Sequence, residues 1–302
     1  MKRILLFILT NIAILAAITI VTRLLGVDHW LYANGISYTE LLGFSLVCGF
    51  TGSFISLAMS KWMAKMAYQI QVIEKPSSEA EQWLVDTVRS QAAKARIAMP
   101  EVGIYDSPEA NAFATGPSRS NSLVAVSTGL LHTMTREEVT GVLAHEITHV
   151  SNGDMVTMTL LQGILNTFVI FLSRVFAFFL DRALSGGREE RGEGIGFFLA
   201  SLAFQILFGF LASLVIYAYS RAREYRADAG SAALEGKGPM LAALRRLKEI
   251  TEVQVAAGAP VVDNRAPAFN AFKINGAPRH ASLFADHPSL DDRIAALEKL
   301  PS

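Results

Sequence analysis

Four long blocks of apolar residues divide the chain, and stretches richer in charged and polar residues separate them. The blocks cover residues 4–21, 41–60, 155–180 and 195–219. A helix of about 20 apolar residues crosses the roughly 30 Å hydrocarbon layer of a bilayer, so each block is long enough to span it. The pattern therefore predicts a polytopic membrane protein that is mainly α-helical, with polar segments outside the lipid.

The first two blocks predict an N-terminal transmembrane hairpin within residues 1–65. The loop between them, residues 26–40, contains no lysine or arginine. Basic residues flank the hairpin at both ends, namely Lys2, Arg3, Lys61 and Lys65. By the positive-inside rule, both ends of the hairpin face the cytoplasm. The first block exceeds the roughly 7–15 apolar residues of a secretory signal, and a second span follows it closely, so we expect an uncleaved anchor.

The last two blocks predict a second hydrophobic helix pair over residues 155–219. Its first half contains Gln162, Asn166 and Arg174, whereas its second half is uncharged. Polar groups within a span usually face protein or a water-filled cavity. Two alternatives are open, because the pair either crosses the membrane as a hairpin or packs largely outside the bilayer. Both alternatives return the chain to the side that it left.

The composition agrees with a membrane protein. Apolar residues make up 51% of the chain, and the mean hydropathy is +0.34. The 27 basic residues balance the 27 acidic ones, so no excess of positive charge indicates a nucleic-acid partner. Cys48 is the single cysteine, which excludes an intrachain disulfide.

The pentapeptide His145-Glu146-Ile147-Thr148-His149 carries the clearest chemical signal. Residues four apart on a helix project from the same face, so the two imidazoles can bind one Zn²⁺. Glu146 is then placed to take a proton from a zinc-bound water. The alternative is a pair of ordinary core histidines that are satisfied by hydrogen bonds.

The residues around this motif predict the helix that it requires. Thr135 and Glu138 have the spacing of a capping box, in which each side chain bonds the backbone N–H of the other residue. Asn152-Gly153 then supplies residues that readily adopt the left-handed conformation that ends a helix.

A third metal ligand is expected in residues 220–231, directly after the fourth block. A catalytic zinc site usually has three protein ligands and one open position for water. Glu224 and Asp228 lie one helical turn apart, so one can bind the metal while the other binds a ligand histidine. The alternative is a solvated helix with arginine–carboxylate pairs. The topology favours the metal site. The histidine motif precedes the third block and this segment follows the fourth, so both lie on the same side of the membrane.

These motifs resemble the HtpX family of bacterial membrane zinc metalloproteases, which is related to the endoproteases that process prenylated CAAX proteins. The resemblance rests on the histidine motif with the following Ser151-Asn152-Gly153-Asp154, and on the Ser-x-x-Arg-Glu-x-x-Ala-Asp pattern that ends at Asp228. It extends over essentially the whole chain. It implies a zincin-like (gluzincin) metalloprotease domain with a small β-sheet and one Zn²⁺ per chain.

The resemblance also implies roles for individual residues. His145, His149 and Glu224 correspond to the zinc ligands, and Glu146 to the general base. Asp228 corresponds to the acid that orients a ligand histidine.

Two further segments match family elements that bind substrate. Asn111-Ala112-Phe113-Ala114 corresponds to an edge strand beside the cleft, where an extended substrate would pair through main-chain hydrogen bonds. A plain buried strand is the alternative, and the flanking run 122–126 supports it. His287, followed by Pro288 and Arg293, corresponds to an active-site His-Pro…Arg element. His287 would then donate to the developing oxyanion or to substrate carbonyls. The alternative is a helix start that Ser289 caps towards Asp292, and both can hold at once.

The resemblance implies an endopeptidase that hydrolyses misfolded or damaged membrane proteins, as part of membrane protein quality control. We expect a bacterial inner-membrane protein whose active site faces the cytoplasm and is assembled from residues 66–154 and 220–302. The expected partners are polypeptide substrates, the lipid bilayer, and either further copies of the chain or other membrane proteases.

Three competing functions differ in where they need polar residues. An intramembrane-cleaving protease carries its histidine motif within the lipid, whereas the turns before His145 contain Thr135, Arg136, Glu137 and Glu138. A membrane scaffold or chaperone with a structural zinc would close all four metal positions, and the matched motifs offer no fourth ligand. A transporter is disfavoured because the polar machinery lies in the extramembrane segments.

Overall fold

The computed structural model describes residues 37–184, 195–256, 258 and 287–301. The predicted span over residues 4–21 and the loop 185–194 lie outside the described residues. The chain divides into two compact units, each built from two stretches of sequence. The first unit comprises Met1–Ile55 and Thr157–Val215, and the second comprises Ser56–Val156 and Ile216–Ser302.

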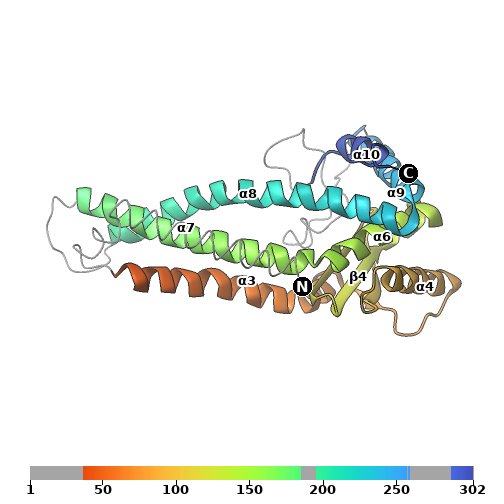
Figure 1. Cartoon of the computed structure of the whole chain (residues 1–302), viewed down its shortest axis with the longest axis horizontal. Coiled ribbons are helices and arrows are strands. Elements are labelled where there is room, and N and C mark those ends of the chain that lie inside the picture. The colour runs from red at the N-terminus through yellow and green to blue at the C-terminus, as the bar shows by residue number, and fades with distance from the viewer. Residues whose placement is uncertain (1–36, 185–194, 257, 259–286, 302) are drawn as a thin grey trace. The chain divides into compact units, whose positions relative to one another are not determined.

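Figure 1 shows a mainly helical protein with one small sheet. The helices are α3 (Tyr38–Tyr68), α4 (Glu79–Lys94), α5 (Thr128–Thr133), α6 (Arg136–Asn152), α7 (Asp154–Leu184), α8 (Ile195–Glu235), α9 (Lys237–Ala256) and α10 (Leu290–Glu298). The strands are β1 (Gln71–Val72), β2 (Glu101–Tyr105), β3 (Ala112–Ser118) and β4 (Asn121–Ser127). The predicted fold class is confirmed.

Three of the described helices, α3, α7 and α8, are long and apolar enough to cross a membrane. The predicted blocks at residues 41–60, 155–180 and 195–219 lie within them. In the first unit, α3 and α7 approach closely where a Cβ on Gly49 would lie 2.5 Å from Oγ1 of Thr167. Phe176 of α7 packs against Phe204 of α8, with ring centroids 5.5 Å apart.

The sheet belongs to the second unit, and its strand order is β1-β2-β4-β3. Strands β2 and β4 are parallel, and the other neighbours are antiparallel. Alternating side chains of β3 and β4 enter two separate cores, as expected from the period of two along a strand. Ala112 and Ala114 join the core that contains residues of α4 and α6, whereas Phe113 packs against Tyr68 at the end of α3.

Helix α6 has the predicted capping box. The Thr135 hydroxyl accepts from the backbone N–H of Glu138, and the Glu138 carboxylate accepts from the backbone N–H of Thr135. Gly153 ends the helix in the left-handed conformation, with φ 71°. Helix α7 begins at the next residue, so one glycine separates the two helices. Both predicted helix boundaries are confirmed.

Close packing joins α6 to the helices that follow it in the second unit. A Cβ on Gly230 of α8 would lie 2.2 Å from Cγ2 of Thr148. A Cβ on Gly141 would lie 2.5 Å from the carbonyl carbon of Pro239 in α9. Helix α10 starts at the Ser289 cap that the sequence predicted, and its Leu297 is fully buried in the core that includes α6 residues.

Candidate metal centre

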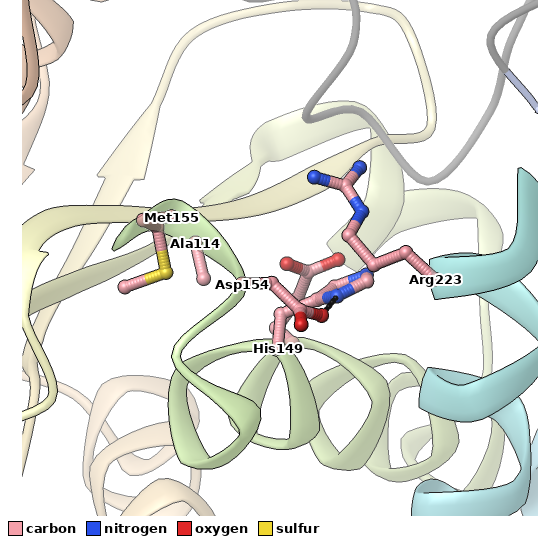
Figure 2. A pocket seen from close by; sticks show the side chains of 6 residues that line it. Ala114, His149, Asp154, Met155 and Arg223 are labelled. Carbon is pink, nitrogen blue, oxygen red and sulfur yellow. Dashed lines mark hydrogen bonds and ion pairs between the residues drawn. The ribbon is translucent and has the colours of Figure 1, made fainter. Parts of the chain in front are cut away.

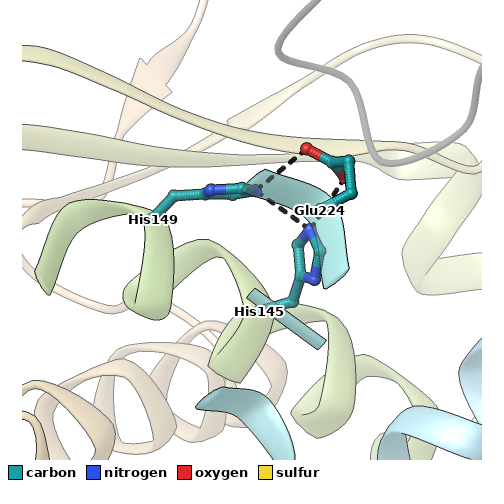
Figure 3. A group of neighbouring side chains, drawn as sticks. All are labelled: His145, His149 and Glu224. Atoms are coloured by element: carbon teal, nitrogen blue, oxygen red, sulfur yellow. Dashed lines mark hydrogen bonds and ion pairs between the residues drawn. The ribbon is translucent and has the colours of Figure 1, made fainter. Parts of the chain in front are cut away.

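Two histidines of α6 and one glutamate of α8 converge in the second unit (Figure 3). The Nε2 atoms of His145 and His149 lie 3.1 Å apart. The Glu224 carboxylate lies 3.3 Å from Nε2 of His145 and 3.4 Å from Nε2 of His149. All three side chains are buried. The structure thus brings together the three residues that the sequence nominated as ligands, although more than 70 positions separate Glu224 from the histidines.

A carboxylate holds the other nitrogen of each ring. Asp228 lies 2.9 Å from Nδ1 of His145, and Asp154 lies 2.7 Å from Nδ1 of His149. An ionised carboxylate only accepts hydrogen bonds, so each ring keeps its proton on Nδ1 when the imidazole is neutral. The two Nε2 lone pairs then face each other and the Glu224 oxygens. Such an arrangement of electron pairs needs a cation at its centre, and the residues present therefore fit a metal ion.

The electrostatic surroundings of His149 also favour a positive charge at the centre of the cluster. Burial disfavours the charged imidazole, but Glu224 and the hydrogen bond that His149 donates to Asp154 outweigh it and raise the pKa of His149 to about 9. Without a metal, a proton takes the central position. A divalent ion that binds between these groups replaces that proton.

Arg293 of α10 completes the surroundings of His145. Its Nε and one terminal nitrogen donate to the two Asp228 oxygens at 2.8 and 2.6 Å. The side chain is enclosed, with 1% of its surface exposed, and the two-pronged contact holds the Asp228 carboxylate against His145. The structure places Arg293 behind the ligands, and its predicted contact with substrate stays a prediction.

A pocket opens beside the histidines, and Figure 2 shows its lining. It is lined by Ala114, Glu146, His149, Asp154, Met155 and Arg223. Oε2 of Glu146 is buried there without a hydrogen-bond partner among the described residues. Burial raises the pKa of Glu146, the effect expected of a carboxyl group that exchanges protons near neutrality.

Strand β3 borders this pocket and forms one edge of the sheet. The backbone N–H of Ser127 donates to the carbonyl of Asn111, so these opposed residues form a hydrogen-bonded pair. In an antiparallel ladder such pairs alternate with non-bonded ones. The N–H and C=O groups of Ala112 and Ala114 therefore point away from β4, towards the side of β3 on which no other described strand pairs. The segment is both buried and at an edge, so it combines features of the two alternatives that the sequence left open.

His287 also reaches the centre, from the segment before α10. Its Nδ1 lies 3.4 Å from Oε2 of Glu224, and the residue is 9% exposed. The Ser289 cap follows directly, so the helix start and a position near the metal ligands occur together.

Residues 78–301 match the family model of peptidase family M48. The chain belongs to peptidase family M48. Among curated M48 relatives, it is 60% identical to "Protease HtpX homolog" of Methylacidiphilum infernorum over 301 residues, which cover 99% of both chains. It is 53% identical to the homolog of Pelodictyon phaeoclathratiforme, again with 99% of each chain covered.

A solved structure supports the M48 fold. The crystal structure of S. mikatae Ste24p matches 97% of this chain and 67% of its own, with a TM-score of 0.60 and 19% identity. With the three apolar helices and the metal-compatible cluster, this M48 chain is a multi-pass, membrane-bound metalloprotease that acts on polypeptides.

Two residues of the M48 centre escaped the sequence reasoning. Asp154 was noticed only as part of a family motif, yet it binds His149. Its position directly after the Asn-Gly helix end was the available signal. Arg223 was assigned no role from the sequence, but it is 2% exposed and donates to Glu224 at 3.1 Å. No local pattern distinguishes it from its exposed neighbour Arg226.

Proposed function

We propose that this chain is a zinc endopeptidase in which His145, His149 and Glu224 hold one Zn²⁺. The convergence of two imidazoles and one carboxylate, with both Nδ1 atoms held by other acids, carries this proposal. Two nitrogen donors and one oxygen donor are a usual catalytic zinc set, which leaves one position for water. Bound zinc in such a site acidifies a water molecule and polarises the substrate carbonyl.

Glu146 is proposed as the general base. It precedes Ile147 on the buried face of α6, lines the pocket, and has one carboxylate oxygen without a described partner. Its raised pKa suits a group that accepts a proton from water and delivers it to the leaving amine.

The edge strand β3 is proposed to hold the substrate. The backbone groups of Ala112 and Ala114 point away from β4, towards the side of β3 that no other described strand covers, and Ala114 lines the same pocket as Glu146. An extended peptide that adds to this edge would pass the general base. Main-chain pairing is insensitive to side chains and agrees with broad sequence tolerance.

His287, Asp228 and Arg293 are proposed to act around the reacting groups. His287, beside Glu224, is placed to donate to a developing oxyanion or to substrate carbonyls. Asp228 orients His145, and Arg293 positions Asp228. For Arg293 we therefore favour a positioning role over the substrate contact that the family resemblance implied.

The proposed biological role is the removal of misfolded or damaged membrane proteins from the bacterial inner membrane, alone, as an oligomer or beside other membrane proteases. Residues 66–154 and 220–302 would form the cytoplasmic zinc-protease part, and residues 1–65 and 155–219 the membrane part. The basic residues Lys61 and Lys65 after the second predicted span support a cytoplasmic orientation. The curated relatives' name, protease, supports proteolysis and says nothing of substrate.

Two rivals are less well supported. An intramembrane protease requires its ligands within a span, whereas α6 is not among the described helices that are apolar enough to cross a membrane. A scaffold with a structural zinc requires a closed four-ligand site, whereas the cluster found in the described part of the chain has three members.

The deciding experiment compares the wild type with Glu146→Gln in purified, zinc-loaded protein. We expect Glu146→Gln to retain one zinc per chain but to lose casein cleavage. Glu137→Gln is the matched control, since Glu137 is exposed on the same helix. A chelator should abolish the wild-type activity, and added zinc should restore it. Retained cleavage by Glu146→Gln would refute the assignment of the base.

Orientation has a separate test. Externally added protease should cut the loop 185–194 only in vesicles whose outer surface corresponds to the periplasmic face. Cleavage only from the cytoplasmic face would contradict the proposed second hairpin.

A further inference from the structure

Arg223 is a buried cation in the wall of the pocket that contains Glu146. It is 2% exposed, and it lines this pocket together with His149 and Ala114. One of its terminal nitrogens donates to Oε1 of Glu224 at 3.1 Å. A guanidinium carries five N–H donors in a planar fork, so it can bond one carboxylate and a second acceptor at the same time.

Arg223 lies across the pocket from the strand that is proposed to hold the substrate. Figure 2 shows Arg223 and Ala114 on opposite sides of the pocket, with His149 and Asp154 between them. A peptide that pairs with β3 directs the N–H and C=O groups of alternate residues towards β3, and those of the residues in between away from it. The carbonyl oxygens that point away from β3 therefore face the side of the pocket that carries Arg223.

The formal charges around the histidines give the charge of Arg223 a part in the reaction. Four carboxylates and two guanidinium groups surround the histidines in the described part of the chain, namely Glu146, Asp154, Glu224, Asp228, Arg223 and Arg293. A divalent metal bound to neutral imidazoles brings the formal charge of this group to zero. Without Arg223, the same group would carry a negative charge where peptide hydrolysis places an anionic oxygen. Such a charge is costly in a buried site of low dielectric constant.

We propose that Arg223 is a catalytic residue, which donates to the carbonyl oxygen under attack and stabilises the oxyanion that this oxygen becomes. Glu146 takes a proton from the attacking water, the new C–O bond forms, and the π electron pair of the carbonyl moves onto its oxygen. The negative charge thus leaves Glu146 and appears on an oxygen that faces Arg223. His287 lies beside Oε2 of Glu224, whereas Arg223 contacts Oε1, so the two donors approach different oxygens of one carboxylate. The inference rests on the proposed peptidase function and assigns it a further residue.

The test compares Arg223→Met with the wild type in purified, zinc-loaded protein. Because an oxyanion donor is lost, we expect kcat for a casein-derived peptide to fall about 100-fold, while KM stays within about threefold. Zinc affinity in a chelator titration should equal or exceed the wild-type value, because a positive charge beside the metal site is removed. A fall in zinc affinity of about tenfold or more would show that Arg223 only holds Glu224 in place, and would overturn the proposal. The control Arg226→Met changes an exposed arginine of the same helix and should match the wild type in all three measurements.

A phosphinic peptide built on the same casein sequence gives a readout that does not depend on turnover. Its tetrahedral, anionic group resembles the oxyanion, so Arg223→Met should bind it about 100-fold more weakly than the wild type. The uncleaved parent peptide should bind Glu146→Gln about equally well with and without Arg223→Met. Equal binding of the phosphinic peptide by the wild type and Arg223→Met would overturn the proposal.

A second neutral variant keeps the comparison decisive if Arg223→Met does not fold. Arg223→Gln retains a hydrogen-bond donor but not the charge, and the same criteria apply to it. Arg223→Lys retains the charge and should regain about tenfold in kcat over the neutral variants. Wild-type kcat in a folded neutral variant would overturn the proposal. A wild type that does not cleave casein would instead refute the proposed function itself, and the inference would fall with it.

Discussion

Gly230 of α8 sets the distance between the glutamate ligand and the two histidines. It faces Thr148 of α6, the residue just before His149, and lies less than two turns from Glu224. We predict that Gly230→Ala weakens zinc binding and proteolysis, although the substitution leaves every ligand unchanged.

The magnitude follows from the packing. A Cβ on Gly230 would lie 2.2 Å from Cγ2, 2.7 Å from Oγ1 and 3.0 Å from Cβ of Thr148, where ordinary contacts lie at 3.4–4 Å. The helices must separate locally by about 1 Å to relieve these contacts, whereas ligand distances in metal sites tolerate only about 0.2 Å. Overpacking costs about 1–3 kcal/mol, of which better helix propensity recovers at most about 1 kcal/mol. We expect zinc affinity to fall about 10- to 100-fold, as when groups that orient ligands are lost.

The assay is a competitive chelator titration of purified protein, followed by casein cleavage at saturating zinc. Gly238→Ala is the matched control, because its new Cβ would meet only Glu137 Oε1, at 3.8 Å. The double variant Gly230→Ala/Thr148→Ala removes the two closest clashing atoms and should recover most of the affinity. Zinc binding by Gly230→Ala within twofold of the wild type, or no recovery in the double variant, would refute the reasoning.

Three further predictions concern the groups around the ligands. Asp154→Ala removes a buried hydrogen bond to His149, worth about 1.5–3 kcal/mol, and should weaken zinc binding about 10- to 100-fold by chelator titration. The control Asp86→Ala, on the exposed surface of α4, should bind zinc like the wild type. Equal losses of zinc affinity in both variants would contradict the role of Asp154. Arg293→Met leaves Asp228 buried without its counter-charge and should lower the free energy of unfolding by about 3–5 kcal/mol in urea titrations; an unchanged midpoint would contradict this. The pKa of His149 in the metal-free protein is about 9, so zinc must displace a proton from this ring at lower pH. Apparent zinc affinity should therefore rise about tenfold per pH unit up to about pH 9 and then level off. An affinity that does not change from about pH 6 to 8 would count against this prediction.

Features that depend on neighbouring residues could be predicted from the sequence. The apolar blocks identify the helices of the described membrane unit because hydrocarbon accepts only long apolar helices. Thr135 and Glu138 identify the start of α6, and Gly153 its end, because caps bond within one turn. The histidine pair required only the helical period.

Features that depend on tertiary contacts could not be predicted in this way. The partnership of Arg293 with Asp228 joins α10 to α8 across 65 positions, and no local pattern specifies it. The two-residue strand β1 is too short to leave a periodic signal, and its pairing with β2 is a tertiary contact. The sequence alone left Glu224 and Asp228 as interchangeable candidates for the third ligand. Only the fold shows that Glu224 lies beside the two Nε2 atoms, whereas Asp228 lies beside Nδ1 of His145.

The left-handed backbone conformation of Gly153 affects the chemistry of the metal centre. By ending α6 there, it lets Asp154 turn back to His149 and fixes which ring nitrogen carries hydrogen. A bulky residue at this position would strain the backbone, so His149 would remain in the chain with its tautomer unspecified. Such a protein would retain all of its metal ligands and still be defective, because the proton on His149 would no longer be held on one ring nitrogen.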